Sequence, residues 1–445
     1  MIENVLLITI DSLRYDSVPT AERSSSSTLA GLQSSATSFT RAFATGPGTT
    51  PSFPAILTGT LPLSYGGFGS LSESRPHLSE YLGCAGLKTA AFQCNPFLSR
   101  HFNYDVGYSE FKDYQNPLMG LATKMFPRGI EINNPKLRRI DDTLHLTDAI
   151  KNTYQLIKGK PRPYVSADVI TDDALDWLSK INSPFFCWTH YMDVHHPCFP
   201  PMRYRERHNT ANISQSQVSK WYSALLREPE TLSNSEIEAL RRLYDAAIDY
   251  TDDQIGRITN YLEEAGRYES TLIIITSDHG EIFGEHGQYG KPERMYDELL
   301  HVPLIVVNGP DYLVGAADNL VSLLDIPPLI HDTLDLEVPD EYKGQIPGKD
   351  QPRDFIMAEH EVEGDVIVGA RSEDWLYEGD EIMNDHRLFD LQDGGFERRS
   401  RDHLKATTIR EAVLTRLEEL DVEAEYLQGD VNDNVESRLE DLGYL

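Results

Sequence analysis

Two carboxylates and an imidazole follow two aliphatic runs of this chain. Asp11 comes directly after the run at residues 5–10, and Asp278 and His279 come after the run at residues 272–276. Both places are the carboxyl ends of expected strands, where open α/β sheets form ligand crevices. Adjacent carboxylate and imidazole groups are donors that divalent metal ions bind, so the Asp-His-Gly-Glu segment at residues 278–281 indicates a metal site. Asp11 alone fits helix capping equally well.

A loop rich in glycine and proline at residues 46–60 supplies hydroxyl groups. It carries Thr49 and leads into the short apolar run at residues 55–57. A hydroxyl on such a turn can present a nucleophile beside backbone N–H donors at a helix start. Taken alone, the loop favours the simpler interpretation, a tight turn closed by a side-chain hydrogen bond.

Short runs rich in Val, Ile and aromatic residues alternate with amphipathic stretches. We expect strands at residues 5–10, 88–92, 184–191, 272–276 and 302–307. The clearest helical spacing covers residues 235–265. This alternation predicts an α/β fold, with a large, mostly parallel sheet flanked by helices on both faces.

The pattern changes after residue 335. We expect short strands at residues 355–358, 366–370 and 375–377 and a helix at 409–420, with a poorly ordered or surface-hugging acidic end from residue 421. The chain is therefore predicted to hold a catalytic domain at 1–335 and a small C-terminal antiparallel α+β subdomain at 336–445.

The charge balance excludes one class of partner. The chain has 71 acidic and 40 basic residues and a formal net charge of −31. Because phosphate backbones require clustered cations, we expect no nucleic-acid partner. A solvated acidic surface adapted to high salt, as in a halophilic acidic proteome, explains the composition.

Cysteine spacing and hydropathy bear on location. Four cysteines lack C-x-x-C spacing and lie among apolar neighbours, which indicates buried thiols rather than a zinc site or disulfides. The N-terminus lacks a basic region, and no apolar run reaches the ~18 residues that span a bilayer. We expect a cytoplasmic protein without a membrane anchor.

Four motifs, in order, resemble the signatures of the sulfatases, a family of the alkaline-phosphatase-like superfamily. They lie at residues 4–11, 49–59, 189–197 and 276–287, with further similarity at 290–291, 301–304, 325–328 and 388–391. The resemblance covers nearly the whole chain and implies the superfamily's fold. It also implies that Asp11, Asp278, His279 and the Thr49 oxygen hold one divalent ion. This O/N donor set fits Ca²⁺, Mn²⁺ or Mg²⁺, and the imidazole favours Mn²⁺ over Ca²⁺ in affinity.

Thr49 occupies the position that sulfatases fill with Cys or Ser and convert to formylglycine. Threonine cannot form formylglycine, but related branches of the superfamily attack with an unmodified Thr, so Thr49 is the predicted nucleophile. Pro51 and Ser52 match the family motif, whereas Phe53 replaces its Arg. Ser12 replaces a second Asp, which suggests the smaller ligand set of the phosphonate-monoesterase-like branch.

The resemblance also suggests which residues bind the substrate. Lys291 lies 13 residues after Asp278 (291 − 278) and matches the family's sulfate-binding lysine. His195 matches a histidine that binds the oxyanion or protonates the leaving oxygen, and His196 and His190 compete for that role. A surface lysine and a structural histidine are the plainer alternatives.

Asn95 lies where sulfatases often carry a Gly-Lys pair, and we include it with His196 as substrate-binding. The implied activity is metal-dependent hydrolysis of a sulfate ester of a carbohydrate or small alcohol. A phosphate mono- or diester hydrolase or a phospho-group transferase fits the same residues, and a non-catalytic anion- or glycan-binding protein is the second alternative. The pocket walls are expected from loops at residues 115–163 and 200–235, which carry no readable motif.

Overall fold

A seven-stranded sheet forms the centre of the molecule. The computed structural model describes residues 1–20, 27–67, 69–114, 164–292, 294–362, 365–380, 386–392, 397–399 and 406–431. The strand order is β2-β10-β7-β1-β6-β4-β5, in which β7 to β5 are parallel and β10 runs antiparallel to both of its neighbours. The bounds are β1 Asn4–Ile10, β2 Thr37–Phe39, β4 Lys88–Phe92, β5 Glu110–Lys112, β6 Phe185–Tyr191, β7 Thr271–Ser277 and β10 Leu304–Val307. The predicted α/β fold is confirmed, and each of the five expected strands is present with ends shifted by two residues or fewer.

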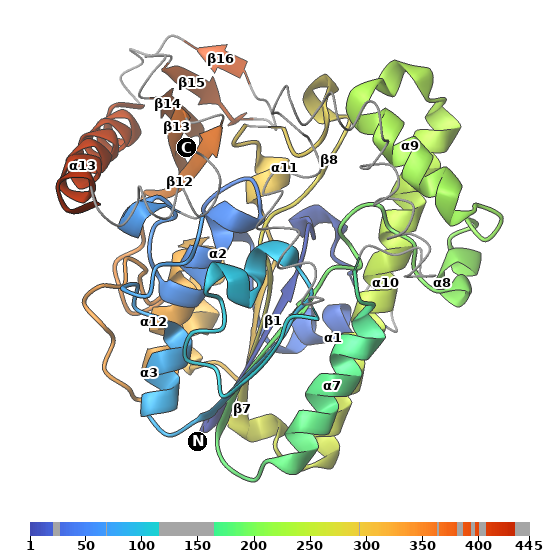
Figure 1. The fold of residues 1–445 in the computed structure, drawn as a ribbon, viewed down its shortest axis with the longest axis horizontal. Coiled ribbons are helices and arrows are strands. Elements are labelled where there is room, and N and C mark those ends of the chain that lie inside the picture. The colour runs from blue at the N-terminus through green and yellow to red at the C-terminus, as the bar shows by residue number, and fades with distance from the viewer. Residues whose placement is uncertain are drawn as a thin grey trace, which may run out of the picture.

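Helices cover both faces of this sheet. Alternate residues of each strand point to opposite faces, so that Leu7 and Leu6 of β1 lie in two separate cores. One core receives α2 (Thr49–Thr58), α3 (Leu78–Cys84) and α12 (Ile326–Thr333), and the other receives α1 (Thr28–Ser35), α7 (Ala167–Lys180) and α10 (Asn234–Glu264) (Figure 1). Helix α10 is the predicted helix at 235–265, and it begins with a capping box between Ser233 and Glu236.

A second, antiparallel sheet lies beyond the carboxyl ends of β1 and β7 (Figure 1). Its strands are β12 Phe355–Val362, β13 Asp365–Ser372, β14 Trp375–Asp380, β15 Arg387–Asp390 and β16 Glu397–Arg399, and helix α13 (Thr407–Val431) packs against them. The three expected strands are confirmed. Helix α13 continues through residues 421–431, and residues 432–445 lie outside the described residues, so the poorly ordered or surface-hugging acidic end stays a prediction. The boundary at 335/336 stays a prediction.

Two further predictions need correction. The segment 200–235 is not a loop, because it forms α8 (Met202–Arg207) and α9 (Gln215–Arg227), the latter with a capping box at Ser214. The segment 115–163 lies outside the described residues. Cys84 is exposed because it lies on the outer side of α3, whereas the other three cysteines are buried as expected and all four are free. None of the helices in the described ranges is both long and apolar enough to cross a bilayer.

The remaining short elements surround the carboxyl ends of the central strands. They are β3 Arg41–Phe43, β8 Ile282–Phe283, β9 Tyr289–Gly290, α11 Asp297–Leu300 and β11 Leu320–Ser322. Strand β3 pairs with β11 and leads directly into the loop before α2.

Candidate active site

Two neighbouring strands bring the predicted metal ligands together. Ile10 of β1 pairs with Ser277 of β7, so Asp11 and Asp278, the next residues, leave the sheet side by side. Donor atoms of Asp11, Asp278 and His279 all lie within 4.8 Å of one another, and the three residues are buried. Register between parallel strands thus makes one cluster from residues far apart in sequence.

Asp11 is surrounded by hydrogen-bond donors and positive charge. Its Oδ1 accepts a 2.7 Å hydrogen bond from the Ser12 hydroxyl, and its Oδ2 accepts one of 3.0 Å from Asn95 Nδ2. Lys291 Nζ lies 3.8 Å from Oδ1. Burial raises the pKa of Asp11, but its electrostatic interactions with the His195 ring and the Lys291 ammonium group outweigh burial and hold it well below its usual range.

Asp278 has hydrogen-bond donors and positive charge nearby as well, but they do not outweigh burial. Its Oδ1 accepts hydrogen bonds from the backbone N–H groups of Ser12 (3.2 Å) and His279 (3.0 Å). Its buried Oδ2 makes no hydrogen bond of good geometry with a described residue. Burial and the negative charge of Asp11 raise the pKa of Asp278 to about 7. Two buried carboxylates this close together can both be ionised only when a cation lies beside them.

The ring of His279 is fixed as a ligand. Its Nδ1 donates a proton to the carbonyl of Gly280 at 2.8 Å, so Nε2 keeps its lone pair. Nε2 points into the cluster, 3.4 Å from Asp278 Oδ2 and 3.7 Å from Asp11 Oδ1. Burial and the charge of Lys291 lower the pKa of His279 to about 3, so the ring is neutral. Two carboxylates and a neutral imidazole fit a divalent cation.

Thr49 lies at the edge of this cluster, as the first residue of α2. Its hydroxyl is 3.3 Å from His279 Nε2, which accepts the hydrogen bond. The loop before it is closed by two internal hydrogen bonds, from the Thr45 hydroxyl to the Pro51 carbonyl (2.9 Å) and from the Ser52 hydroxyl to the Gly46 carbonyl (3.1 Å). The loop is therefore a turn closed by side-chain hydrogen bonds, and it can still expose the Thr49 hydroxyl as a nucleophile. Ser52 stabilises this turn.

Phe53, at the family's arginine position, is fully buried. Its ring lies 5.5 Å from that of Trp188 and 5.1 Å, edge to face, from that of His190. This position is apolar, so no cation is supplied to the site from here.

His190, which the sequence placed only as a competitor for another role, reaches the cluster from β6. Trp188 Nε1 donates to the Thr9 hydroxyl at 2.9 Å, and Thr9 Oγ1 lies 2.9 Å from His190 Nδ1 but 3.4 Å from the Thr189 carbonyl. The Thr9 proton therefore goes to Nδ1, which leaves Nε2 protonated and 3.5 Å from Asp11 Oδ2. The sequence around it gives no local signal of this position, because a histidine packed in a core can have the same neighbours.

Lys291 and His195 lie beside the cluster. The Lys291 side chain is 24% exposed and follows β9 directly. His195 Nδ1 donates to the His196 carbonyl at 2.6 Å, so its Nε2 carries the lone pair. Burial and the charge of Lys291 lower the pKa of His195 to about 4. The roles of both residues remain proposals.

Two predicted substrate-binding residues have other contacts. Asn95 uses one amide proton on Asp11, and its Oδ1 accepts the Phe97 backbone N–H. The buried ring of His196 is stacked on Tyr222 (4.6 Å) and Tyr244 (5.8 Å) and makes no hydrogen bond or ring contact with the cluster among the described residues. Substrate contact by either stays a prediction.

Glu281, the last residue of the Asp-His-Gly-Glu segment, is also buried, and its Oε1 accepts a 3.3 Å hydrogen bond from the Tyr222 hydroxyl. Burial raises its pKa to about 7, although the charge of Lys291 acts against this shift. No separate role for Glu281 is predicted from the sequence.

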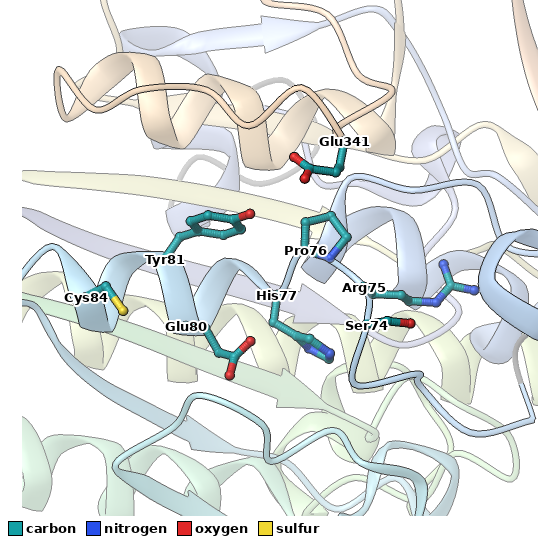
Figure 2. A pocket seen from close by; sticks show the side chains of 8 residues that line it. All are labelled: Ser74, Arg75, Pro76, His77, Glu80, Tyr81, Cys84 and Glu341. Carbon is teal, nitrogen blue, oxygen red and sulfur yellow. The ribbon is translucent and has the colours of Figure 1, made fainter.

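A separate cavity lies between α3 and the chain after α12. Figure 2 shows the eight residues that line its volume of about 310 Å³, which are Ser74, Arg75, Pro76, His77, Glu80, Tyr81, Cys84 and Glu341. None of them belongs to the cluster around Asp11. This cavity is therefore distinct from the candidate site.

The chain is similar to known sulfatases in sequence and to a phosphonate monoester hydrolase in structure. The Sulfatase family model matches residues 3–336. An uncharacterized sulfatase, YidJ, of Escherichia coli (strain K12) is 32% identical over 45% of this chain and 43% of its own length. An arylsulfatase of Clostridium perfringens is 26% identical over 43% of this chain and 44% of its own. The phosphonate monoester hydrolase of Silicibacter pomeroyi shares the fold, with a TM-score of 0.65 at 20% identity over 94% of this chain and 95% of its own.

The chain therefore has the fold of a solved phosphonate monoester hydrolase, with the cluster at the carboxyl ends of its central strands. Because the family model covers three quarters of its length, the chain belongs to the sulfatase family. The aligned region spans less than half the length of these two curated relatives.

Proposed function

We propose that the protein hydrolyses a sulfate ester of a carbohydrate or other small alcohol, with Thr49 as nucleophile and a divalent ion at Asp11, Asp278 and His279. The main support is the 3.3 Å contact between the Thr49 hydroxyl and His279 Nε2 at the edge of the buried carboxylate pair. When bound, the ion would lower the pKa of that hydroxyl and stabilise charge on the ester oxygens.

Three residues have separate roles in the proposed reaction. Thr49 Oγ1 forms a bond to sulfur while the bond from sulfur to the alcohol oxygen breaks, and the Thr49 proton goes to solvent. Lys291 binds the anionic oxygens. His195 Nε2 protonates the leaving oxygen, because a bound anion raises the pKa of this ring from its free value of about 4. Water then attacks the Thr49 sulfate, and His195 takes up its proton.

The charges favour a substrate with one negative charge. Two carboxylates cancel the charge of a divalent ion, and Lys291 is left to balance a single substrate charge, since Phe53 contributes none. Sulfate monoesters, phosphodiesters and phosphonate monoesters carry one charge at neutral pH, whereas phosphate monoesters carry about two. Hydrolysis of a monoanionic phosphorus ester is therefore the second candidate.

The test compares wild type with Thr49→Ala on an aryl sulfate, an aryl phosphate, a phosphodiester and an aryl phosphonate. Each assay is run with EDTA and after adding back Mn²⁺ or Ca²⁺. We expect metal-dependent turnover of the sulfate that falls by about 10³-fold or more in the variant. Thr50→Ala is the matched control, because it removes the neighbouring hydroxyl and should leave turnover unchanged.

Equal rates in wild type and Thr49→Ala would remove Thr49 from the mechanism. Turnover of the phosphonate or phosphodiester without the sulfate would select the second candidate. Binding of the esters without turnover of any of them would select the non-catalytic alternative. The cytoplasmic location expected from the sequence remains a prediction.

A further inference from the structure

Glu359, on β12 of the C-terminal sheet, contacts the chain on both sides of α2, the helix that begins at Thr49. Its backbone N–H donates to the Thr45 carbonyl at 2.8 Å, four residues before Thr49. Its side-chain Oε2 accepts the Leu63 backbone N–H at 2.7 Å, five residues after the end of α2. One residue of the C-terminal sheet therefore holds both flanks of α2.

The chain segments at this contact are closely packed. A Cβ atom added to Gly46 would lie 2.4 Å from Pro51 Cβ in the same loop and 2.7 Å from the Glu359 carbonyl oxygen, so glycine here allows both the turn and its close contact with β12. Arg416 of α13 donates through Nε to Glu359 Oε1 at 2.5 Å and through Nη2 to the Ser64 hydroxyl at 2.9 Å. The side chains of Arg416 and Glu359 are only 6% and 0% exposed, so this is a buried ion pair.

Glu378, on β14 of the same sheet, holds the other side of the candidate site. Its Oε1 accepts the Met295 backbone N–H at 3.0 Å, and its Oε2 lies 3.4 Å from Arg294 Nη1. Both partners follow Lys291 within four residues. A Cβ atom on Gly369 would lie 2.2 Å from the Met295 sulfur, so this contact too is close.

We infer that the C-terminal sheet is part of the site, with Glu359 positioning the Thr49 loop and Glu378 positioning the Lys291 loop. Neither residue contacts the carboxylate cluster, so both act through the loops that they hold. Such positioning affects rate steeply, because a misplacement of about 1 Å can cost about 10²-fold.

Hydrogen exchange measured by mass spectrometry tests this inference in Glu359→Gln and Glu378→Gln. We expect faster exchange of the peptide at residues 59–66, whose Leu63 N–H binds the Glu359 side chain, in the first variant only. The peptide at 291–297, which contains the Met295 N–H, should exchange faster in the second variant only. Strands β1 and β7 should exchange as in wild type in both. Asp390→Asn is the control, because it removes an ion pair with Arg399 from the same sheet. It should change neither peptide.

Kinetics give a second readout, which rests on the proposed function. Glu359→Gln should lower kcat about 10-fold or more with KM within about twofold, since Thr49 acts in the chemical step. Glu378→Gln should instead raise KM, since Lys291 binds the anion. If wild type turns over no ester, the proposed function fails while the exchange experiment still decides the positioning roles.

Removing one partner of a buried ion pair leaves the other charge unpaired, so Glu359→Gln can fail to fold. In that case Glu359→Gln combined with Arg416→Met removes both charges, and the same faster exchange at residues 59–66 is expected. Equal acceleration of both peptides in one variant, or of neither, would overturn the inference.

Discussion

At the scale of single residues, the site depends on which ring nitrogen carries a proton. Backbone carbonyls fix the Nδ1 proton of His279 and of His195, and Thr9 fixes the opposite tautomer in His190. His279 can therefore donate a lone pair to a cation, while His190 donates a proton toward Asp11. Side chains that orient metal ligands in this way commonly affect affinity by about 10-fold or more.

The Thr9 hydroxyl gives a prediction at this scale. Thr9→Val removes the acceptor of Trp188 and the donor to His190, so Asp11 loses an oriented neighbour. We expect Mn²⁺ binding, measured by isothermal titration calorimetry, to weaken about 10-fold.

Thr276→Val is its matched control. Thr276 is buried opposite Thr9 in the sheet, and its hydroxyl donates to the Pro303 carbonyl at 2.7 Å. We expect this variant to lose stability without losing affinity for Mn²⁺. A similar loss of affinity in both variants would contradict the orienting role of Thr9.

At the scale of elements, strand ends and periodicity predicted the fold and the cluster. Aliphatic runs ending in Asp11 and Asp278 locate two strand termini, and parallel pairing makes them neighbours. His190 was missed as a cluster residue because nothing local distinguishes a histidine that faces a site from one packed in a core. Helix α9 was missed although the capping box at Ser214 marks its start, and α8 was missed because it has no side-chain cap. The contacts of Glu359 depend on tertiary packing and have no sequence signal.

The turn after β7 gives a prediction at this scale. A Cβ atom on Gly280 would lie 2.0 Å from the Glu298 carbonyl oxygen, so Gly280→Ala must move this turn and His279 with it. We expect a loss of about 2 kcal/mol in the free energy of urea unfolding and weaker Mn²⁺ binding. Gly31→Ala is the control, since Gly31 lies in α1 with open space around it and should gain about 0.5–1 kcal/mol. Unchanged Mn²⁺ affinity in Gly280→Ala would contradict the account of this turn.

At the scale of the whole molecule, the acidic surface and the site have separate consequences. The net charge of −31 acts on the folded state as a whole, whereas the cluster requires one local cation. The C-terminal sheet contacts the loops on either side of the cluster, the loop before α2 and the loop after β9. Composition predicted the acidic net charge. The contacts of the C-terminal sheet are visible only in the folded structure.

Salt should therefore stabilise the protein through screening. The Debye length falls from ~30 Å at 0.01 M to ~3 Å at 1 M salt, so self-repulsion weakens over this range. We expect the melting temperature to rise with KCl, and to rise less in sucrose of equal osmolality, which adds no screening. Greater stability at low salt would contradict this expectation.

The most direct test of the account looks for the Thr49 sulfate itself. Mixing excess aryl sulfate with metal-loaded enzyme and quenching within the first turnovers allows the phenol released and the protein mass to be measured together. If hydrolysis of the Thr49 ester is slower than its formation, the account predicts a burst of about one phenol per enzyme. It also predicts one added SO₃ group on the peptide that contains Thr49. Steady turnover with the SO₃ group on another residue would contradict it.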